Sequence, residues 1–261
     1  MLIDFHAHCY PDELAEKAVR NMGEISGQTH ATDGTLRDTI RHMRDWRVDA
    51  FVVLNIAMNP TQHRNVNDFA AAMSSETVFG FGSVFPGAKD ATEELLRIRK
   101  LGLKGVKLHA DFQDFMFDDP VAYPVYDTLA ELGLPLVVHA GFDPVSPQFI
   151  HCPPSAIRTV ADRFPTLQIV AAHLGGMLLW DEVERHLVGV KNVALDTAML
   201  ATYITPEQCA RIINNHERIV FGSDCPWHSP ALEHEFLLSL GLPEKRYEDI
   251  FYKNAMALLG L

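Results

Sequence analysis

The sequence predicts an α/β fold, a (β/α)₈ TIM barrel with extra helices at its C-terminal end. Two observations support this prediction. Eight short apolar runs are spaced along the 261 residues, and eight is the number of strands that this barrel needs. Amphipathic stretches separate most of these runs and suit the right-handed crossover helices that join parallel strands. Because no long linker or low-complexity segment interrupts the alternation, we expect residues 1–261 to form one domain.

The strand-like runs are short, mostly apolar and bounded by polar or turn-forming residues. In chain order they cover residues 2–8, 50–57, 77–85, 105–110, 134–141, 167–175, 192–200 and 218–224. Helical patterns, several of them opened by proline or a hydroxyl cap, cover residues 92–102, 121–133, 154–165, 179–189 and 205–216. After the eighth run, residues 230–261 are expected to form further helices that pack on the outside of the barrel.

Composition excludes several classes of partner. The formal charge is −12, from 34 acidic and 22 basic residues, and no basic cluster occurs, which argues against nucleic acid. No segment reaches the roughly 18 uninterrupted apolar residues of a membrane span, and the first residues are strand-like. The four cysteines form no CxxC pair, as expected of reduced thiols. We therefore expect a cytoplasmic protein that acts on a small molecule.

Side chains that bind metal ions stand at the C-terminal ends of the apolar runs. In a parallel barrel these ends and the loops after them form the active-site face. Strand alternation places Asp4, His6 and His8 on one side of the first run, and Lys107 with His109 on one side of the fourth. The full set of such histidines and acids is His6, His8, His109, His139, His173 and Asp224.

Two histidines at positions i and i+2 of one strand can bind a single ion. His6 and His8 have this spacing, and His139 and Asp224 would complete a set of three nitrogens and one oxygen from elsewhere around the ring. Such a set suits Zn²⁺ and also accepts Mn²⁺, Fe²⁺ or Co²⁺. We expect one divalent ion, with zinc as the first choice.

Four blocks of the sequence carry a family resemblance: DFHAHCYP, LVVHAGFDP, IVAAHLGGM and IVFGSDCPW. They resemble the metal-site blocks of the amidohydrolase superfamily, and most closely its amidohydrolase-2 group, which includes aminocarboxymuconate-semialdehyde decarboxylase and related aromatic-acid decarboxylases. The resemblance implies a (β/α)₈ barrel with metal ligands at His6, His8, His139 and Asp224. It also implies that His173 assists catalysis, and it allows a homodimer.

The expected chemistry is that of a Lewis-acid metal, which lowers the pKa of bound water toward neutrality. Asp224 would act as general base and then as acid to a leaving group, and His173 would hold the water or polarise a carbonyl group. These residues serve hydrolysis of a C–N or C–O bond. They equally serve non-oxidative decarboxylation of an aromatic or unsaturated acid, which stays open as the alternative. The substrate itself is not indicated by the sequence.

Further candidates for substrate binding follow from the same strand ends. Lys107 is expected to anchor a substrate carboxylate with His109 beside it. The resemblance to the amidohydrolase superfamily implies an alternative, in which a carboxylated Lys107 bridges two ions and His139 and His173 are ligands of the second. Asp196, at the end of the seventh run, would contact substrate or orient His173. His228 would contact substrate from the loop after Asp224, and loop aromatics such as Phe112, Trp180 and Trp227 would form an apolar wall.

Two other classes of protein deserve comparison. A TatD-type deoxyribonuclease shares the barrel and the HxH pair. That group places a metal-bridging glutamate on the fourth strand, whereas the fourth run of this chain has none, and the strongly negative charge also weighs against a nuclease. A non-catalytic barrel could hold a structural metal. Structural zinc sites are usually closed, whereas this site would open onto the functional face of the barrel, so an enzyme is favoured.

Overall fold

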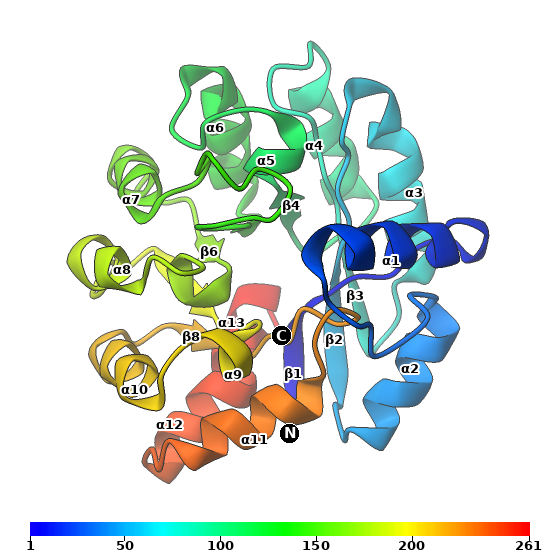
Figure 1. Ribbon diagram of the computed structural model, residues 1–261. Helices are drawn as coiled ribbons and strands as arrows, with labels where there is room; N and C mark the ends of the chain where they lie inside the picture. The colour runs from blue at the N-terminus through cyan, green and yellow to red at the C-terminus, as the bar shows by residue number, and fades with distance from the viewer.

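Eight parallel strands alternate with helices around a common centre (Figure 1) in the computed structural model, which describes residues 1–261. The strands are β1 (Ile3–Ala7), β2 (Ala50–Leu54), β3 (Val78–Phe81), β4 (Val106–Leu108), β5 (Leu136–Val138), β6 (Ile169–Ala171), β7 (Val193–Asp196) and β8 (Ile219–Val220). Each lies inside one of the eight apolar runs, so the predicted barrel class is confirmed.

Neighbouring strands pair in chain order, as β1-β2-β3 and as β4-β5-β6-β7-β8. Backbone hydrogen bonds join these two groups on both sides. The N–H of Lys107 on β4 donates to the carbonyl of Gly82 after β3 at 2.8 Å. The N–H of Asp224 after β8 donates to the carbonyl of His6 on β1, also at 2.8 Å. The first strand therefore lies beside the last, and the ring of eight is complete.

Helices surround the ring, and each predicted helical stretch overlaps one. They are α1 (Asp12–Ser26), α2 (Leu36–Asp45), α3 (His63–Met73), α4 (Ala91–Lys100), α5 (Ala110–Gln113), α6 (Tyr123–Leu132), α7 (Pro154–Arg163), α8 (Trp180–His186), α9 (Leu200–Tyr203), α10 (Pro206–Asn215), α11 (Pro230–Ser239), α12 (Glu244–Glu248) and α13 (Asn254–Leu259). Short 3₁₀ segments lie at Pro60–Gln62, Pro120–Ala122 and His173–Gly175, and a π-helical turn at Asp249–Lys253. The side chains of Thr35 and Thr205 cap α2 and α10 by accepting backbone N–H bonds.

The barrel interior is a layer of buried apolar side chains contributed by nearly every strand. It contains Phe5, Val52, Leu54, Phe79, Phe81, Val137, Val170, Ala194 and Val220. Lys107 pairs in register with Val137, and Val137 pairs with Val170, so Lys107 occupies the β4 position of the same layer. The Lys107 side chain therefore starts from the interior layer, and it reaches the cavity at the strand ends, as its inward-facing register predicts.

Strict alternation along the first strand is broken, which corrects one expectation. The pairing of β1 with β2 shifts between Asp4 and Ala7, so the strand carries a bulge-like irregularity there. Ile3 and Phe5 belong to the interior layer, and His6, which directly follows Phe5, lines the cavity together with His8. Asp4 does not share the face of these histidines, because its carboxylate turns to the Ser223 hydroxyl at 2.5 Å.

The C-terminal helices do not all pack on the outside, which corrects a second expectation. α11 and α12 lie on the outer wall, but α13 lies behind the centre of the barrel in Figure 1. Its residues Ala255 and Leu259 join the interior layer together with Ile3 of β1. α13 therefore closes the end of the barrel away from the carboxyl ends of the strands, because burying its apolar face there is more favourable than exposing it.

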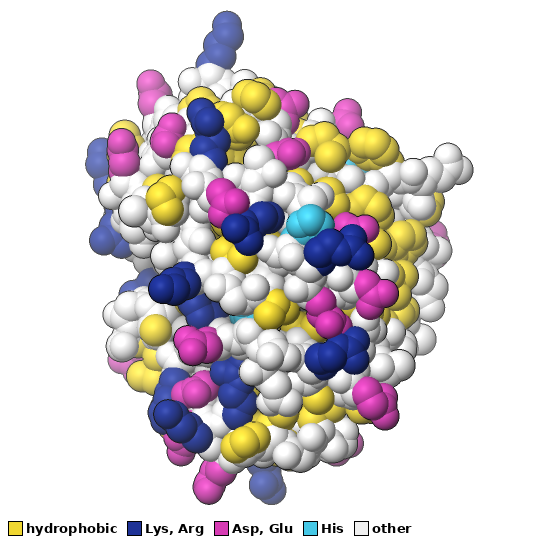
Figure 2. Space-filling model, turned by 90° about the vertical axis from the view of Figure 1, so that its left-hand side faces the viewer, with side chains coloured by type: hydrophobic (Ala, Val, Ile, Leu, Met, Phe, Trp, Pro, Cys, Tyr) yellow, Lys and Arg dark blue, Asp and Glu magenta, His cyan; other side chains and the backbone are white.

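Acidic and basic side chains are interspersed on the face that carries the outer helices α7, α8 and α10 (Figure 2). Ion pairs stabilise this face: Arg158 pairs with Asp162 at 2.7 Å within α7, and Arg211 of α10 pairs with Glu184 of α8 at 2.6 Å. None of the helices combines the length and the apolar character that a bilayer crossing requires.

Candidate metal centre and substrate cavity

A cavity of about 180 Å³ opens at the carboxyl ends of the strands. Seven of the ionisable residues singled out in the sequence line it, namely His6, His8, Lys107, His109, His139, His173 and Asp224. α1 lies over the strand ends (Figure 1), and its residues Met22 and Ser26 form part of the wall. The parallel strands thus deliver side chains that are far apart in sequence to one site.

The first group of ligand atoms, which we name the His6 cluster, consists of His6, His8 and Asp224. Oδ1 of Asp224 lies 3.4 Å from Nε2 of His6 and 3.0 Å from Nε2 of His8. The other nitrogen of each ring is already engaged: Nδ1–H of His6 donates to Asp196 at 2.8 Å, and Nδ1–H of His8 to the Leu54 carbonyl at 2.7 Å. Both Nε2 lone pairs therefore remain free toward one point, which fits a divalent cation.

Electrostatics favour the ligating form of these groups. Burial by itself would raise the pKa of Asp224, but His6 and His8 outweigh it and hold this pKa well below its usual range. Burial lowers the pKa of His8, which favours the neutral form of its ring, although the Asp224 charge acts in the opposite direction. Asp224 has φ 69°, a left-handed conformation that is rare for residues with a side chain and is often found at functional sites.

The four predicted ligands do not form one group. His139 lies outside the His6 cluster, since only His6, His8 and Asp224 have ligand atoms within 4.8 Å of one another. His173 stands between the two parts: its Nε2 lies 3.0 Å from Nδ1 of His139, and its ring centroid lies 5.4 Å from that of His6. Nε2 of His139 lies 3.2 Å from the Phe142 carbonyl, in the loop after β5.

A second group forms around His139. Ligand atoms of His109, Asp111, His139 and Asp143 lie within 4.8 Å of one another, and all four residues are buried. The rings of His109 and His139 stack with centroids 4.4 Å apart and an interplanar angle of 9°. The sequence reasoning missed Asp111 and Asp143. The available signal was their spacing, because each follows a strand-end histidine by two or four residues.

Lys107 is buried on the cavity wall and forms no ion pair with an acidic side chain. Burial lowers the pKa of its amino group, while the charges of Asp196 and Asp224 act in the opposite direction. The alternative with a carboxylated lysine needs His139 and His173 as ligands of a second ion. In the structure these two rings instead direct one nitrogen each at the other, 3.0 Å apart.

Two residues predicted to bind substrate lie behind the cavity wall. Asp196 is 0% exposed, and its second oxygen accepts the backbone N–H of His173 at 2.8 Å. It therefore orients His6 and His173 instead of facing the cavity. His228 contacts the hydroxyl of Thr202 at 2.8 Å and the carboxylate of Glu233 at 2.5 Å, which turns its ring away from the cavity.

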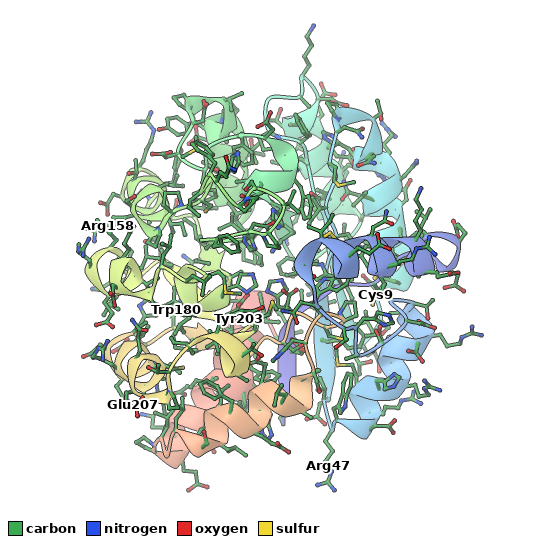
Figure 3. All side chains as sticks on the ribbon, viewed as in Figure 1. Cys9, Arg47, Arg158, Trp180, Tyr203 and Glu207 are labelled. Atoms are coloured by element: carbon green, nitrogen blue, oxygen red, sulfur yellow. The ribbon has the colours of Figure 1, made fainter.

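Aromatic side chains form much of the remaining wall. Phe112 and Trp227 line the cavity as expected, together with Tyr10, Phe142 and Tyr203. Tyr203, on α9, lies over the mouth of the barrel near the centre of the view in Figure 3. Trp180 does not reach the cavity, because its indole N–H donates to the carbonyl of His173 at 3.1 Å behind it.

Comparison with known proteins extends over almost the whole chain. A family model described as Amidohydrolase matches residues 3–261. No curated protein sequence is significantly similar to the chain.

Three solved structures show the same fold. An uncharacterized TIM-barrel protein from Bordetella bronchiseptica has 20% identity and a TM-score of 0.78, over 99% of this chain and 98% of the other. A 5-carboxyvanillate decarboxylase from Sphingomonas paucimobilis has 18% identity and a TM-score of 0.70, over 100% and 99%. A dihydroxybenzoic acid decarboxylase from Polaromonas sp. JS666, solved with bound manganese and the inhibitor 2-nitroresorcinol, has 16% identity and a TM-score of 0.74, over 100% and 97%.

Proposed function

Since the chain belongs to the amidohydrolase family, we propose that it is a metal-dependent enzyme that hydrolyses a C–N or C–O bond of a small, carboxylate-bearing molecule. The single observation that carries the proposal is the His6 cluster. Two imidazole nitrogens with free lone pairs converge on one carboxylate oxygen at the base of the cavity. Few arrangements other than a cation site explain this convergence of acceptors.

The proposed ion is a divalent cation held by His6, His8 and Asp224. Two imidazoles and a carboxylate suit zinc and also manganese, the metal of the Polaromonas structure. A cation bound there would supply Lewis acidity, which polarises a substrate carbonyl group or activates water for attack. His139, the fourth ligand indicated by the sequence, is left out of this set because His173 separates it from the other three.

Three residues of the chain would carry the remaining steps. The Asp224 carboxylate, which is anionic, can accept a proton from the attacking water and then deliver it to the leaving group. His173 has partners on both ring nitrogens, His139 and the Ala198 carbonyl, so we assign it the positioning of neighbouring groups. Lys107 would bind the substrate carboxylate, because a buried amino group without an acidic partner is stabilised by an incoming anion.

A decarboxylase of an aromatic or unsaturated acid is the second candidate. The observation that favours it is the aromatic wall of the cavity, which Lys107 also lines; this wall consists of Tyr10, Phe112, Phe142, Tyr203 and Trp227. A flat ring would stack on this wall while its carboxylate faces the lysine. Both candidates use the same cation site.

The test is a substrate panel measured with chelated and metal-restored enzyme. Amides, esters and lactones that bear a carboxylate are compared with hydroxylated benzoic acids. We expect turnover in one of these two classes, its loss on chelation and its return with zinc or manganese. Asp224→Asn should abolish turnover with the fold intact, because asparagine tolerates the left-handed backbone at this position. Full turnover by metal-free protein would contradict the proposal.

A further inference from the structure

The wall of the cavity changes from polar to apolar between its base and its mouth. Ionisable groups at the base are almost fully buried, with Lys107 and His6 each 1% exposed. At the mouth, Leu178 is 48% and Tyr203 38% exposed. Hydrophobic side chains also gather along the right-hand edge of Figure 2, which is the face that looks toward the viewer in Figure 1. A molecule in the cavity therefore meets charged groups at one end and apolar groups at the other.

Leu178, in the loop after β6, has a conformation that the fold does not explain. Its φ is 59°, in the left-handed region that bulky side chains rarely adopt. Its side chain lines the cavity but is not part of the hydrophobic core. The residue thus combines an unfavourable backbone with an exposed apolar side chain, and core packing offsets neither.

Backbone contacts hold this loop in place. The N–H of Met177 donates to the carbonyl of Ala140 at 2.8 Å, and the N–H of Phe142 donates to the carbonyl of Met177 at 2.9 Å. The two loops approach so closely that a Cβ on Gly141 would lie 2.2 Å from the nitrogen of Met177. The contact between the loops after β5 and β6 therefore fixes the backbone directly before Leu178.

Met199, after β7, is a second unusual residue of the same wall. It is the N-cap of α9 with φ 64° and ψ 14°, and its side chain forms no capping hydrogen bond. N-caps are usually serine, threonine, aspartate or asparagine. The N–H of Ala201 instead donates to the carboxylate of Glu233 at 3.1 Å. Because this carboxylate serves the start of the helix, the Met199 side chain is free to line the cavity.

We infer that Leu178 and Met199 form an apolar subsite, which binds the part of the substrate that lies away from its carboxylate. Residues in sparsely populated backbone conformations cluster at ligand-binding positions. A ligand that covers Leu178 removes its apolar surface from water and offsets the unfavourable backbone. Methionine adapts its shape to its neighbours, so the subsite suits a hydrocarbon chain or a ring. The inference rests on the proposed function for the place of the carboxylate and adds the substrate class, a carboxylate with an apolar group.

The experiment compares the binding of butanoate and octanoate to metal-restored protein by isothermal titration calorimetry. Each added methylene should strengthen binding roughly threefold while the cavity covers it, so octanoate should bind at least about tenfold more tightly. Leu178→Asn and Met199→Asn should each lower the affinity for octanoate by about threefold to tenfold and leave that for butanoate unchanged. Both variants should unfold at the same or a higher urea concentration than the wild type, because asparagine tolerates a left-handed backbone.

Arg47→Asn is the matched control. Arg47 also has a left-handed backbone, with φ 58°, but it precedes β2 and extends away from the barrel at the lower edge of Figure 3. Asparagine should relieve the backbone there as well. The ratio of the two affinities should stay at the wild-type value, because Arg47 does not line the cavity.

Three results would overturn the subsite. The first is equal affinity of the wild type for the two acids, or binding of neither. The second is a loss of stability in both asparagine variants with an unchanged affinity ratio, which would assign the two side chains to the fold. The third is a changed elution volume of Leu178→Asn in size-exclusion chromatography with an unchanged ratio, which would assign Leu178 to contact between two copies of the chain.

The affinity ratio also separates this inference from the proposed function, because both acids carry the same carboxylate. Metal-dependent turnover without a preference for the longer acid would overturn the subsite and leave the proposed function standing. A preference for octanoate in protein that shows no metal-dependent turnover would support the subsite and count against the proposed function.

Discussion

Nδ1 of His6 lies 2.8 Å from Oδ2 of Asp196, and both side chains are buried beneath the cavity. The same carboxylate accepts the backbone N–H groups of His173 and Ala198 through its other oxygen, at 2.8 and 3.0 Å. One side chain on β7 thus sets the ring orientation of His6 and the backbone of His173. Burial raises the pKa of Asp196, but His6 and these hydrogen bonds outweigh it and keep the pKa below its usual range.

Asp196→Asn should weaken cation binding at the His6 cluster. An asparagine has only one acceptor oxygen, so either His6 or the two backbone N–H groups lose their partner. Loss of such an outer contact typically lowers metal affinity by roughly 10–100-fold. Competition with a chromogenic chelator measures the affinity. Asp4→Asn is the matched control, because Asp4 is equally buried but its carboxylate contacts no imidazole ring. Equal losses in both variants would show that buried charge in general is responsible.

His6→Ala should lose the ion at the His6 cluster and with it most turnover. The circular dichroism spectrum should stay nearly unchanged, because His6 contributes its ring to the cavity wall and its backbone to β1. Elemental analysis of the purified variant tests this. His30→Ala serves as the control, since His30 is an exposed loop residue. Wild-type metal content in His6→Ala would contradict the cation site assigned here.

Lys107→Met should stabilise the protein while impairing substrate binding. Burial without an ion pair disfavours the charged amino group, and methionine fills a similar volume without that cost. We expect an increase of about 1 kcal/mol or more in the free energy of unfolding, measured in urea. KM for a carboxylate substrate should rise more than kcat falls. Lys100→Met, at an exposed position at the end of α4, should change neither quantity.

The strands and most of the cavity could be predicted because each depends on the pattern of apolar and polar residues within short stretches of the chain. Apolar runs set the strand positions, and parallel strands of one barrel must bring their carboxyl ends together, so His6, His8, Lys107 and Asp224 meet. The irregularity of β1 could not be predicted, because strict alternation assumes an unbroken ladder and the sequence does not mark the residue where pairing shifts.

The residues that contact His139 could not be predicted from the sequence either. A strand end fixes where a side chain starts, but loop conformation decides which nitrogen meets which neighbour. The turn after β5 brings Asp143 back to His139, and the one-turn helix after β4 places Asp111 beside His109. The division of the histidines between two clusters therefore emerges only from the loops, and so does the placement of His228 against Glu233.

His216 should make the stability of the protein fall as the pH is lowered toward 4. Burial lowers the pKa of this histidine to about 4, against the hydrogen bond to the Val193 carbonyl, and nearby Arg246 and Arg218 lower it further. Above pH 6.5, the ordinary value, the ring is neutral in both the folded and the unfolded state, so the folded protein has its full stability. Between about 6.5 and 4 the unfolded chain binds the proton first, and the folded state loses stability by an amount on the order of 3 kcal/mol.

His216→Gln removes this titration and should flatten the pH dependence in the same window. Glutamine can still reach the Val193 carbonyl and the Gly189 N–H that His216 contacts at 3.1 and 3.2 Å, so the variant should fold. Urea unfolding at pH 7, 5.5 and 4.5 gives the three free energies for each protein. The difference between wild type and variant should shrink as the pH falls, whereas the exposed His30→Gln should follow the wild type throughout. A constant difference would mean that His216 binds its proton equally well in the folded and unfolded states.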